Sequence, residues 1–435
     1  MYRIKRMCST IAVHLKVAIQ NGVLWIFGCS VFSQLCTFLS SIFVIRHLQK
    51  IDYGNYVDAS NIFSYIVAFI GMGFTNAILQ YCSENRELSE KNGIYKYSKS
   101  KGMAFNCVLV VIVLSISITR IISGQKMPGI YLGMMSLQPF VVYTNSYNQI
   151  ILRVRRKNKE YGIVHILYSL SVVIGNVLFT KIWGVMGLII STYLANGVAA
   201  LSGRLYLRSL SFYSEIKKNI KMLEDATKKE IDKYALLCAA TNFSSSILVL
   251  IDITVLNVLL SNAEVLADYR VGSVIPSACM FIPSSLITFF YPELVSRIVT
   301  GKEEFITFFK KLFAVFLAIN GIVGVVLYFG SSIFIKTIYG DKYLSAVGIM
   351  KLLSINFIFS AGFRKLFGNT IAALKRTHIN LILSIISGVI NIILDVVFVL
   401  HYGSQGAAVA TLFISCFISA LEFLYILKYL RDMAY

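Results

Sequence analysis

Three cations lie inside an otherwise apolar stretch, residues 344–374, that is long enough to span a membrane as a helix: Lys351, Arg364 and Lys365. A charge at the centre of a bilayer costs at least about 3 kcal/mol, so such residues tend to face a water-filled cavity lined by protein. Fixed cations in a cavity of lowered dielectric constant bind an anionic group such as a diphosphate strongly. The alternative is that Arg364 and Lys365 snorkel to the cytoplasmic edge of the membrane, and that Lys351 snorkels outward.

The spacing of these cations suggests a path for an anion. Lys351 and Lys365 are 14 residues apart, which returns them to nearly the same face of a regular helix and separates them by about 21 Å along its axis. One diphosphate cannot contact both, so we expect a relay in which Arg364 and Lys365 receive the anion from the cytoplasmic side. Lys351 then receives it further out. Arg46, near the outer end of the first span, is placed to attract it as it leaves.

Uncharged and acidic polar residues inside other apolar segments are candidates for lining a cavity or for coupling. Asp252 lies two-thirds of the way along residues 235–260, Asp58 and Asn61 lie at the start of the second span, and Gln34 lies in the first span. Two alternatives remain open at this stage. In the first, the small polar residues serve close helix packing, and in the second, Asp58 only caps the start of its helix.

The composition determines the class of fold that must hold these residues. The chain has 435 residues, of which 57% are hydrophobic, and its mean hydropathy is +0.72. Apolar runs of spanning length recur along it. We therefore predict an all-α polytopic membrane protein with about twelve transmembrane helices. The expected spans are residues 22–45, 59–82, 102–122, 129–152, 161–180, 184–207, 235–260, 270–291, 310–330, 344–374, 379–400 and 404–427.

The positive charge is distributed as expected for a membrane protein. Of the 41 Lys and Arg residues, 30 fall in segments on the side of the N-terminus and eight on the opposite side, and three lie within residues 344–374. By the positive-inside rule, both termini are cytoplasmic. The same distribution accounts for the net charge of +20 without a nucleic-acid partner. No cleavable signal peptide is evident after the basic N-terminal segment.

The chain divides into two halves of six spans each. We expect an N-terminal bundle over residues 1–207, a hydrophilic cytoplasmic linker over 208–233 and a C-terminal bundle over 234–435. Similar residues recur in the same order near the end of each half. The matched pairs are Asn176 and Asn391, Gly184 and Gly403, and Gly187 and Gly406. With an even number of spans per half, this pattern predicts parallel repeats with a transport path between them.

The motifs of several enzyme classes are absent from the sequence. No nucleophile elbow, zinc-protease motif or P-loop is found, and no histidine stands next to an acidic residue. We therefore predict no catalytic residues, no metal site and no cofactor. The absence of a P-loop also leaves an ion gradient, the membrane potential or the substrate gradient to drive any active transport.

Several short motifs resemble those of polysaccharide flippases. In the first half these are Arg46-x-Leu48, then Tyr53-Gly54-x-Tyr56, and a helix ending in Gln80-Tyr81 before Glu84. In the second half, the run ADYRVGSVIP and the pair Gly403-x-x-Gly406 with Asn391 upstream resemble later signatures of the same proteins. Together with the twelve spans, the resemblance covers nearly the whole chain and is carried by the combination of motifs.

The resemblance points to the multidrug, oligosaccharidyl-lipid and polysaccharide exporter superfamily, and within it to the O-antigen type of flippase. It implies two six-helix bundles around a central cavity (the MATE-like fold) and alternating access in the bacterial inner membrane. The implied substrate is an undecaprenyl-diphosphate-linked oligosaccharide, moved without enzymatic chemistry among membrane lipids. A polysaccharide polymerase and a chain-length regulator are candidate partners.

Two other functional classes remain as alternatives. An ion-coupled multidrug antiporter of the same fold would favour a cavity dominated by carboxylates; the three intramembrane cations argue against it, whereas Asp252 is compatible with it. A membrane-embedded glycan polymerase or acyltransferase would need a catalytic constellation and a large outer loop, and the sequence has neither.

Overall fold

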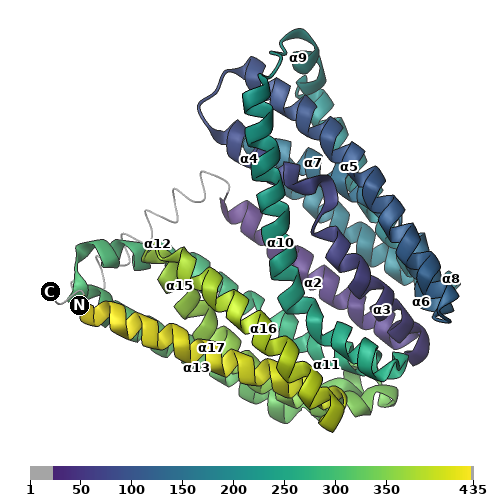
Figure 1. The fold of residues 1–435 in the computed structure, drawn as a ribbon, viewed down its shortest axis with the longest axis vertical. Helices are drawn as coiled ribbons and strands as arrows, with labels where there is room; N and C mark the ends of the chain where they lie inside the picture. The colour runs from purple at the N-terminus through teal and green to yellow at the C-terminus, as the bar shows by residue number, and fades with distance from the viewer. Residues whose placement is uncertain (1–22, 433–435) are drawn as a thin grey trace. The chain divides into compact units, whose positions relative to one another are not determined.

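The computed structural model describes residues 23–432, and within this range the regular structure is helical throughout (Figure 1). The basic N-terminal segment, which carries Arg3, Lys5, Arg6 and Lys16, lies outside the described residues, as does the first residue of the first expected span. Apolar side chains remain widely exposed on the helices; Ile122, for example, is 79% exposed and Phe329 77% exposed. Such surfaces suit a lipid solvent, in which helices satisfy their own backbone hydrogen bonds.

The helices of the first half differ widely in length, from seven residues in α9 to 52 in α8. In chain order they are α2 (Val23–His47), α3 (Lys50–Val67), the 3₁₀ turn η1 (Ile70–Gly73), α4 (Phe74–Ser83), α5 (Leu88–Ile122), α6 (Lys126–Met134), α7 (Gln138–Val154), α8 (Asn158–Ser209), α9 (Phe212–Lys218) and α10 (Asp225–Leu260).

The described part of the second half is also helical. Its elements are α11 (Ala263–Cys279), α12 (Phe281–Thr300), α13 (Lys302–Phe334), the π-turn η2 (Ile335–Tyr339), η3 (Asp341–Ala346), α14 (Val347–Phe359), the π-turn η4 (Ser360–Arg364), α15 (Lys365–Ala373), α16 (Thr377–Tyr402) and α17 (Ser404–Asp432).

Nine helical segments of the described chain are long and apolar enough to cross a membrane, or ten when the bent helix α10 is included. This number is smaller than the number of spans expected from the sequence for two reasons. The 52-residue α8 counts once, although Gly184 breaks it into two helices. In addition, α6 and α7 are each too short to qualify, with nine and 17 residues. The chain is a multi-span helical membrane protein.

The chain forms two compact units. The first comprises the described residues up to Leu48 together with Ile62–Ser246, and the second comprises Gln49–Asn61 together with the residues from Ile247 onwards. The divisions therefore fall in the connection between α2 and α3, inside α3 and inside α10.

In the first unit, α8 packs against both α2 and α7, and α5 packs against α4 and α6. The core is rich in tyrosine, including Tyr81, Tyr95 and Tyr147. The Tyr147 hydroxyl donates to the Tyr95 carbonyl at 3.0 Å, so this buried ring keeps a partner for its polar end.

In the second unit, α16 and α17 lie side by side, α13 packs against α12 and α14, and α14 packs against α11 and α17 (Figure 1). A group of stacked rings fills the space between α13, α15 and α17. Phe313 stacks on Phe367 with ring centroids 5.6 Å apart, and Phe367 stacks on Phe423 at 5.5 Å.

The glycines matched between the halves adopt the same geometry, which confirms this part of the expected repeat. Gly184 and Gly403 both have φ near +57°, with ψ of −132° and −139°. Residues other than glycine rarely adopt this backbone conformation. Three residues later in each half, a Cβ on Gly187 would stand 1.9 Å from the Phe179 carbonyl oxygen, and a Cβ on Gly406 would stand 2.1 Å from the equivalent oxygen of Phe398. Each half thus ends in a helical hairpin closed by close backbone contact.

We predict that Gly187→Ala and Gly406→Ala each destabilise the protein by about 1–3 kcal/mol, because the added methyl group overpacks a backbone contact. The expected result is a lower melting temperature of the detergent-purified protein. Gly197→Ala and Gly321→Ala are matched controls, since a Cβ at either helical position meets nothing within 4 Å. Equal melting temperatures for all four variants would contradict the proposed closure of the hairpins.

Candidate functional site

The three intramembrane cations lie along α14, η4 and α15 of the second unit, and all three are half-buried. The Lys351 ammonium lies 5.7 Å from the ring centroid of Tyr328 on α13, close enough for a cation–π contact. Arg364 is the last residue of η4, and Lys365 is the first residue of α15.

The π-turn η4 changes the angular relation between these cations. A π-turn holds about one more residue than a turn of α-helix, so the faces on its two sides are offset relative to a regular helix. The sequence argument that fourteen residues return Lys365 to the face of Lys351 assumed an unbroken α-helix, and that assumption does not hold here. Lys351 and Lys365 are nevertheless well separated along the helix axis, so their charged groups lie at different depths in the membrane.

Among the described residues, none of the three cations has a carboxylate within 4 Å. Arg364 acts electrostatically on Glu422 of α17, whose side chain is buried at 5% exposure. Lys351 and Lys365 have no such partner in the described chain. These two charges therefore remain available for an anionic ligand.

Asp252 is the centre of a buried polar cluster in the second unit, built from four helices. It accepts hydrogen bonds from the Tyr269 hydroxyl on α11 and, at 3.2 Å, from the Asn391 amide on α16. The Thr411 hydroxyl on α17 lies 2.7 Å from an Asp252 carboxylate oxygen. The Asn391 amide also donates to Asp395 at 2.9 Å, so one amide group joins two buried carboxyl groups.

The two carboxyl groups of this cluster, Asp252 and Asp395, can hold a proton or a small cation. Asp395 is fully buried, and its Oδ1 atom has no hydrogen-bond partner in the described part of the chain. Two buried carboxylates cannot both stay charged without compensation, and the salt bridges of the described residues include neither of them. The Tyr269, Asn391 and Thr411 groups all donate to the Asp252 carboxylate, so they stabilise one negative charge. A second charge on Asp395 requires a proton or a cation.

A neutral version of this cluster occupies the corresponding place in the first unit. There the Asn176 amide donates to the Ser40 hydroxyl at 2.6 Å, and the Ser191 hydroxyl donates to Asn176. Asn176 is the residue that the repeat matches to Asn391. The two halves therefore share one kind of helix junction, and carboxyl groups are present in only one of the two.

The sequence argument identified Asp252 but not Asp395 beside it, nor the buried Glu422 near Arg364. Asp395 and Glu422 lie near the ends of apolar runs and could have been interfacial, whereas the structure buries both. The available signal was the spacing of Asn391 and Asp395, which places both on one helical face toward Asp252.

The other candidate residues have different surroundings. Asp58 accepts a hydrogen bond from Asn257 at 2.7 Å, and the Asn61 amide donates to Thr254 at 2.9 Å. Both contacts join α3 to α10 inside the second unit, and Asp58, well inside α3, is not its cap. Gln34 and Arg46 lie on α2 of the first unit, and both are exposed.

The short motif at the end of α4 organises a turn rather than a binding site. Arg86 contacts Glu84 at 2.8 Å and Glu90 at 2.5 Å, and hydrogen bonding to Glu84 raises the pKa of its guanidinium above the ordinary value. The Tyr81 hydroxyl donates to Glu230 at 3.1 Å. These contacts attach the start of α10 to the first unit.

Comparison with known families is decisive for the class of protein. A family model described as "Polysaccharide biosynthesis protein" matches residues 19–297. The chain belongs to this family. No curated protein sequence matches the chain significantly.

Solved structures similar to this family member are transporters of one fold. An inward-facing multidrug resistance MATE family transporter of the MOP superfamily has a TM-score of 0.73 at 15% identity, covering 92% of this chain and 95% of its own. The lipid II flippase MurJ in an inward closed conformation also has a TM-score of 0.73, at 17% identity, covering 93% of this chain and 87% of its own. A MOP superfamily transporter from Pyrococcus furiosus gives 0.61 at 14% identity, with 96% of each chain covered. These likenesses establish a MATE-like fold.

We predict that Asp252→Asn and Asp395→Asn each abolish any stabilisation of the protein by Na⁺ or by protonation. The measurement is the melting temperature of the purified protein at constant ionic strength, in NaCl against choline chloride and across pH. The wild type should respond to Na⁺ or to pH because the buried carboxyl groups need compensation. Asp341→Asn, at an exposed residue, should respond as the wild type does. A full Na⁺ and pH response in both cluster variants would contradict a coupling role.

Proposed function

We propose that this protein is a flippase that moves an undecaprenyl-diphosphate-linked oligosaccharide, an O-antigen unit or a similar polysaccharide repeat unit, across the bacterial inner membrane. The observation that carries the proposal is the set of half-buried cations on α14 and α15, of which Lys351 and Lys365 have no carboxylate partner in the described chain. Membership of a polysaccharide biosynthesis family supports a glycan substrate. The similarity to the lipid II flippase MurJ supports a lipid-linked one.

The positions of the cations suggest the order in which they act. Arg364 ends η4 and Lys365 begins α15, whereas Lys351 lies in α14. The separation of about 21 Å expected for fourteen helical residues exceeds the span of one diphosphate. We therefore assign capture to Arg364 and Lys365 and later transfer to Lys351. Arg46, exposed on α2, is proposed to attract the head group on release.

Coupling is assigned to the acidic cluster around Asp252. Binding of a proton or Na⁺ there neutralises one of two buried carboxyl groups, and this changes the relative stability of conformations that bury or open the cluster. Asp252 bonds to α11, α16 and α17 at once, so the state of one carboxyl group affects the packing of four helices. This supports alternating access driven by an ion gradient.

The protein's orientation and partners belong to the same proposal. The distribution of Lys and Arg supports cytoplasmic N- and C-termini in the inner membrane. A translocated repeat unit must next be polymerised, so a polysaccharide polymerase and a chain-length regulator are the proposed functional partners.

A second candidate function is ion-coupled multidrug antiport. The acidic cluster favours it, because carboxyl groups exchange protons or Na⁺ as readily for drug export as for lipid transport. An antiporter for cationic drugs would have little use for Lys365, whereas a diphosphate carrier depends on it.

We predict that Lys365→Ala abolishes translocation, because the diphosphate loses its first cation. Lys365→Arg should retain partial function, since the charge remains and only its geometry changes. Lys351→Ala should slow release more than capture. The measurement is the leaflet in which lipid-linked glycan accumulates in cells that carry each variant, at equal protein abundance.

The double variant Lys365→Ala with Asp252→Ala separates binding from simple charge pairing. Recovery of activity in the double variant would mean that the lysine only balances an aspartate. Wild-type translocation by both single alanine variants would refute the diphosphate assignment. Unchanged resistance to cationic drugs in cells that lack the protein would argue against the antiporter.

We also predict the membrane sides of three positions. A cysteine at Gly340 or Ser404 should react with a membrane-impermeant maleimide added to intact spheroplasts, because both loops are assigned to the outside. A cysteine at Ala226, in the first turn of α10, should react only after permeabilisation. Labelling of the Ala226 variant in intact spheroplasts would reverse the proposed orientation.

A further inference from the structure

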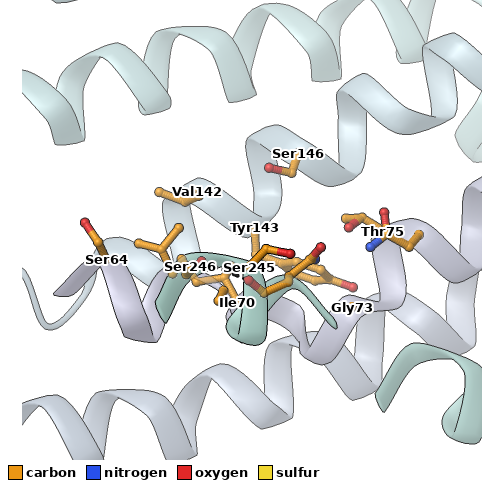
Figure 2. A pocket seen from close by; sticks show the side chains of 13 residues that line it. Ser64, Ile70, Gly73, Thr75, Val142, Tyr143, Ser146, Ser245 and Ser246 are labelled. Carbon is orange, nitrogen blue, oxygen red and sulfur yellow. Dashed lines mark hydrogen bonds between the residues drawn. The ribbon is translucent and has the colours of Figure 1, made fainter. Parts of the chain in front are cut away.

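The first unit contains a polar pocket that the roles assigned above leave unused. Its volume is about 420 Å³, within the range of about 300–1,000 Å³ usual for small-molecule sites. Side chains from four helices line it: Ser64 from α3, Thr75 from α4, Ser146 from α7 and Ser245 from α10 (Figure 2). All of these residues belong to the first unit.

The lining is polar but carries no charge. Seven of the thirteen lining residues are Ser, Thr or Asn, and none is Asp, Glu, Lys, Arg or His. A diphosphate in such a pocket would lack the cations that anions require in a medium of low dielectric constant. A lipid tail gains nothing from amide and hydroxyl groups. The lining suits a neutral ligand that carries many hydroxyl groups.

Several of these polar groups are free to bind a ligand. The side chains of Thr75, Asn76, Ser146 and Asn242 make no hydrogen bond or ion pair with other groups of the described chain. Each amide offers two donors and one acceptor, and each hydroxyl can donate and accept. Ser245 donates to the Thr241 carbonyl at 3.0 Å, which leaves its oxygen able to accept. These are the groups that recognise the hydroxyls of sugars.

One wall of the pocket is formed by a break in a membrane helix. Gly71, Met72 and Gly73 all have positive φ, of 62°, 47° and 74°. The Gly71 amide, which in a continuous helix would bond the Val67 carbonyl, instead donates to the fully buried Asn106 at 2.9 Å. Val67 itself lines the pocket. The break therefore exposes backbone groups to the pocket at the point where the lining side chains converge. Irregular backbone within a membrane protein is typically found around such cavities and ligand sites.

Packing behind the break holds it in place. The Tyr143 ring lies where a Cβ of Gly71 would be, at 2.1 Å, and the Tyr143 hydroxyl donates to the Ser98 carbonyl at 2.6 Å. The Asn106 amide donates to the Pro139 carbonyl at 3.1 Å. A helix break with a non-glycine residue at positive φ costs free energy, and here it is supported by buried side chains from two other helices.

We propose that this pocket binds the neutral oligosaccharide part of the translocated lipid, separately from the diphosphate. The inference rests on the proposed flippase function and adds a sugar-recognition site to it. The class of ligand is an uncharged oligosaccharide, recognised through its hydroxyl and acetamido groups by Asn76, Asn242 and the surrounding serines. The proposed role of this pocket in the first unit is therefore selectivity for the sugar.

The test compares two lipids on the intact, detergent-purified protein by native mass spectrometry. One probe is the pool of polyprenyl-diphosphate-linked glycans extracted from cells lacking this protein, and the other is undecaprenyl diphosphate, which carries no sugar. The variants are Ser146→Leu and Ser245→Leu, which fill the pocket. Ser244→Leu is the matched control, because Ser244 is an exposed neighbour on α10 that does not line the pocket.

The pocket variants should bind the glycan-bearing lipid roughly tenfold more weakly, the effect of losing one or two hydrogen bonds and the space for a ring. Binding of undecaprenyl diphosphate should stay unchanged, and Ser244→Leu should match the wild type with both lipids. Melting temperatures confirm folding, and Asn76→Ala, which removes an amide without filling space, provides a second pocket variant.

The possible failures are distinguishable. Wild-type binding of the glycan-bearing lipid by Ser146→Leu, Ser245→Leu and Asn76→Ala would overturn the sugar pocket and leave the flippase proposal intact. An equal loss for both lipids would also overturn it, because the pocket would then not distinguish sugar from the rest of the lipid. Failure of the wild-type protein to bind either lipid would overturn the flippase proposal and the pocket together.

Discussion

The cost of an unsatisfied polar or charged group in a bilayer is the constraint on which the rest of this structure depends. Polar side chains inside the spans are expensive unless a partner is present, so charged groups without a partner are candidates for a functional role. The hydroxyls of Tyr143 and Tyr147 in the first unit have backbone carbonyl partners. By contrast, Lys351 and Lys365 have no carboxylate partner in the described chain. Asp395 leaves one carboxyl oxygen without a hydrogen bond among the described residues.

The repeated architecture allows the same junction to serve two purposes. In the first unit an asparagine joins serines, and in the second the matching asparagine joins Asp252 to Asp395. The helical hairpins that frame these junctions are closed in the same way, with Gly187 and Gly406 against a backbone carbonyl. Both halves share this scaffold, and the acidic residues at one junction form the proposed site for a proton or cation. The packing and the chemistry can be separated because they depend on different residues.

Much of the fold could be predicted from the sequence because the physical signals are strong. Apolar runs specify membrane helices, and the order of matched glycines specifies the repeat. The candidate site was less predictable. Asp252 was found because a carboxylate within a span is conspicuous, but Asp395 and Glu422 lie near span ends, where a sequence cannot distinguish burial from an interfacial position. The pocket beside Gly71 could not be predicted from the sequence. A short Gly-Met-Gly sequence does not reveal that the Gly71 N–H leaves the helical pattern and donates to Asn106.

The π-turn Ser360–Arg364 divides the tenth expected span into two helical segments that differ in phase. A regular helix has a single phase, so residues that face one direction can be found by counting in steps of three and four. Here the wider turn shifts that phase by about one residue, roughly 100°. Substitution patterns along this helix must therefore be analysed as two separate series, one ending at Phe359 and one beginning at Lys365. A single helical period fitted across both segments would assign residues to the wrong face in one of them.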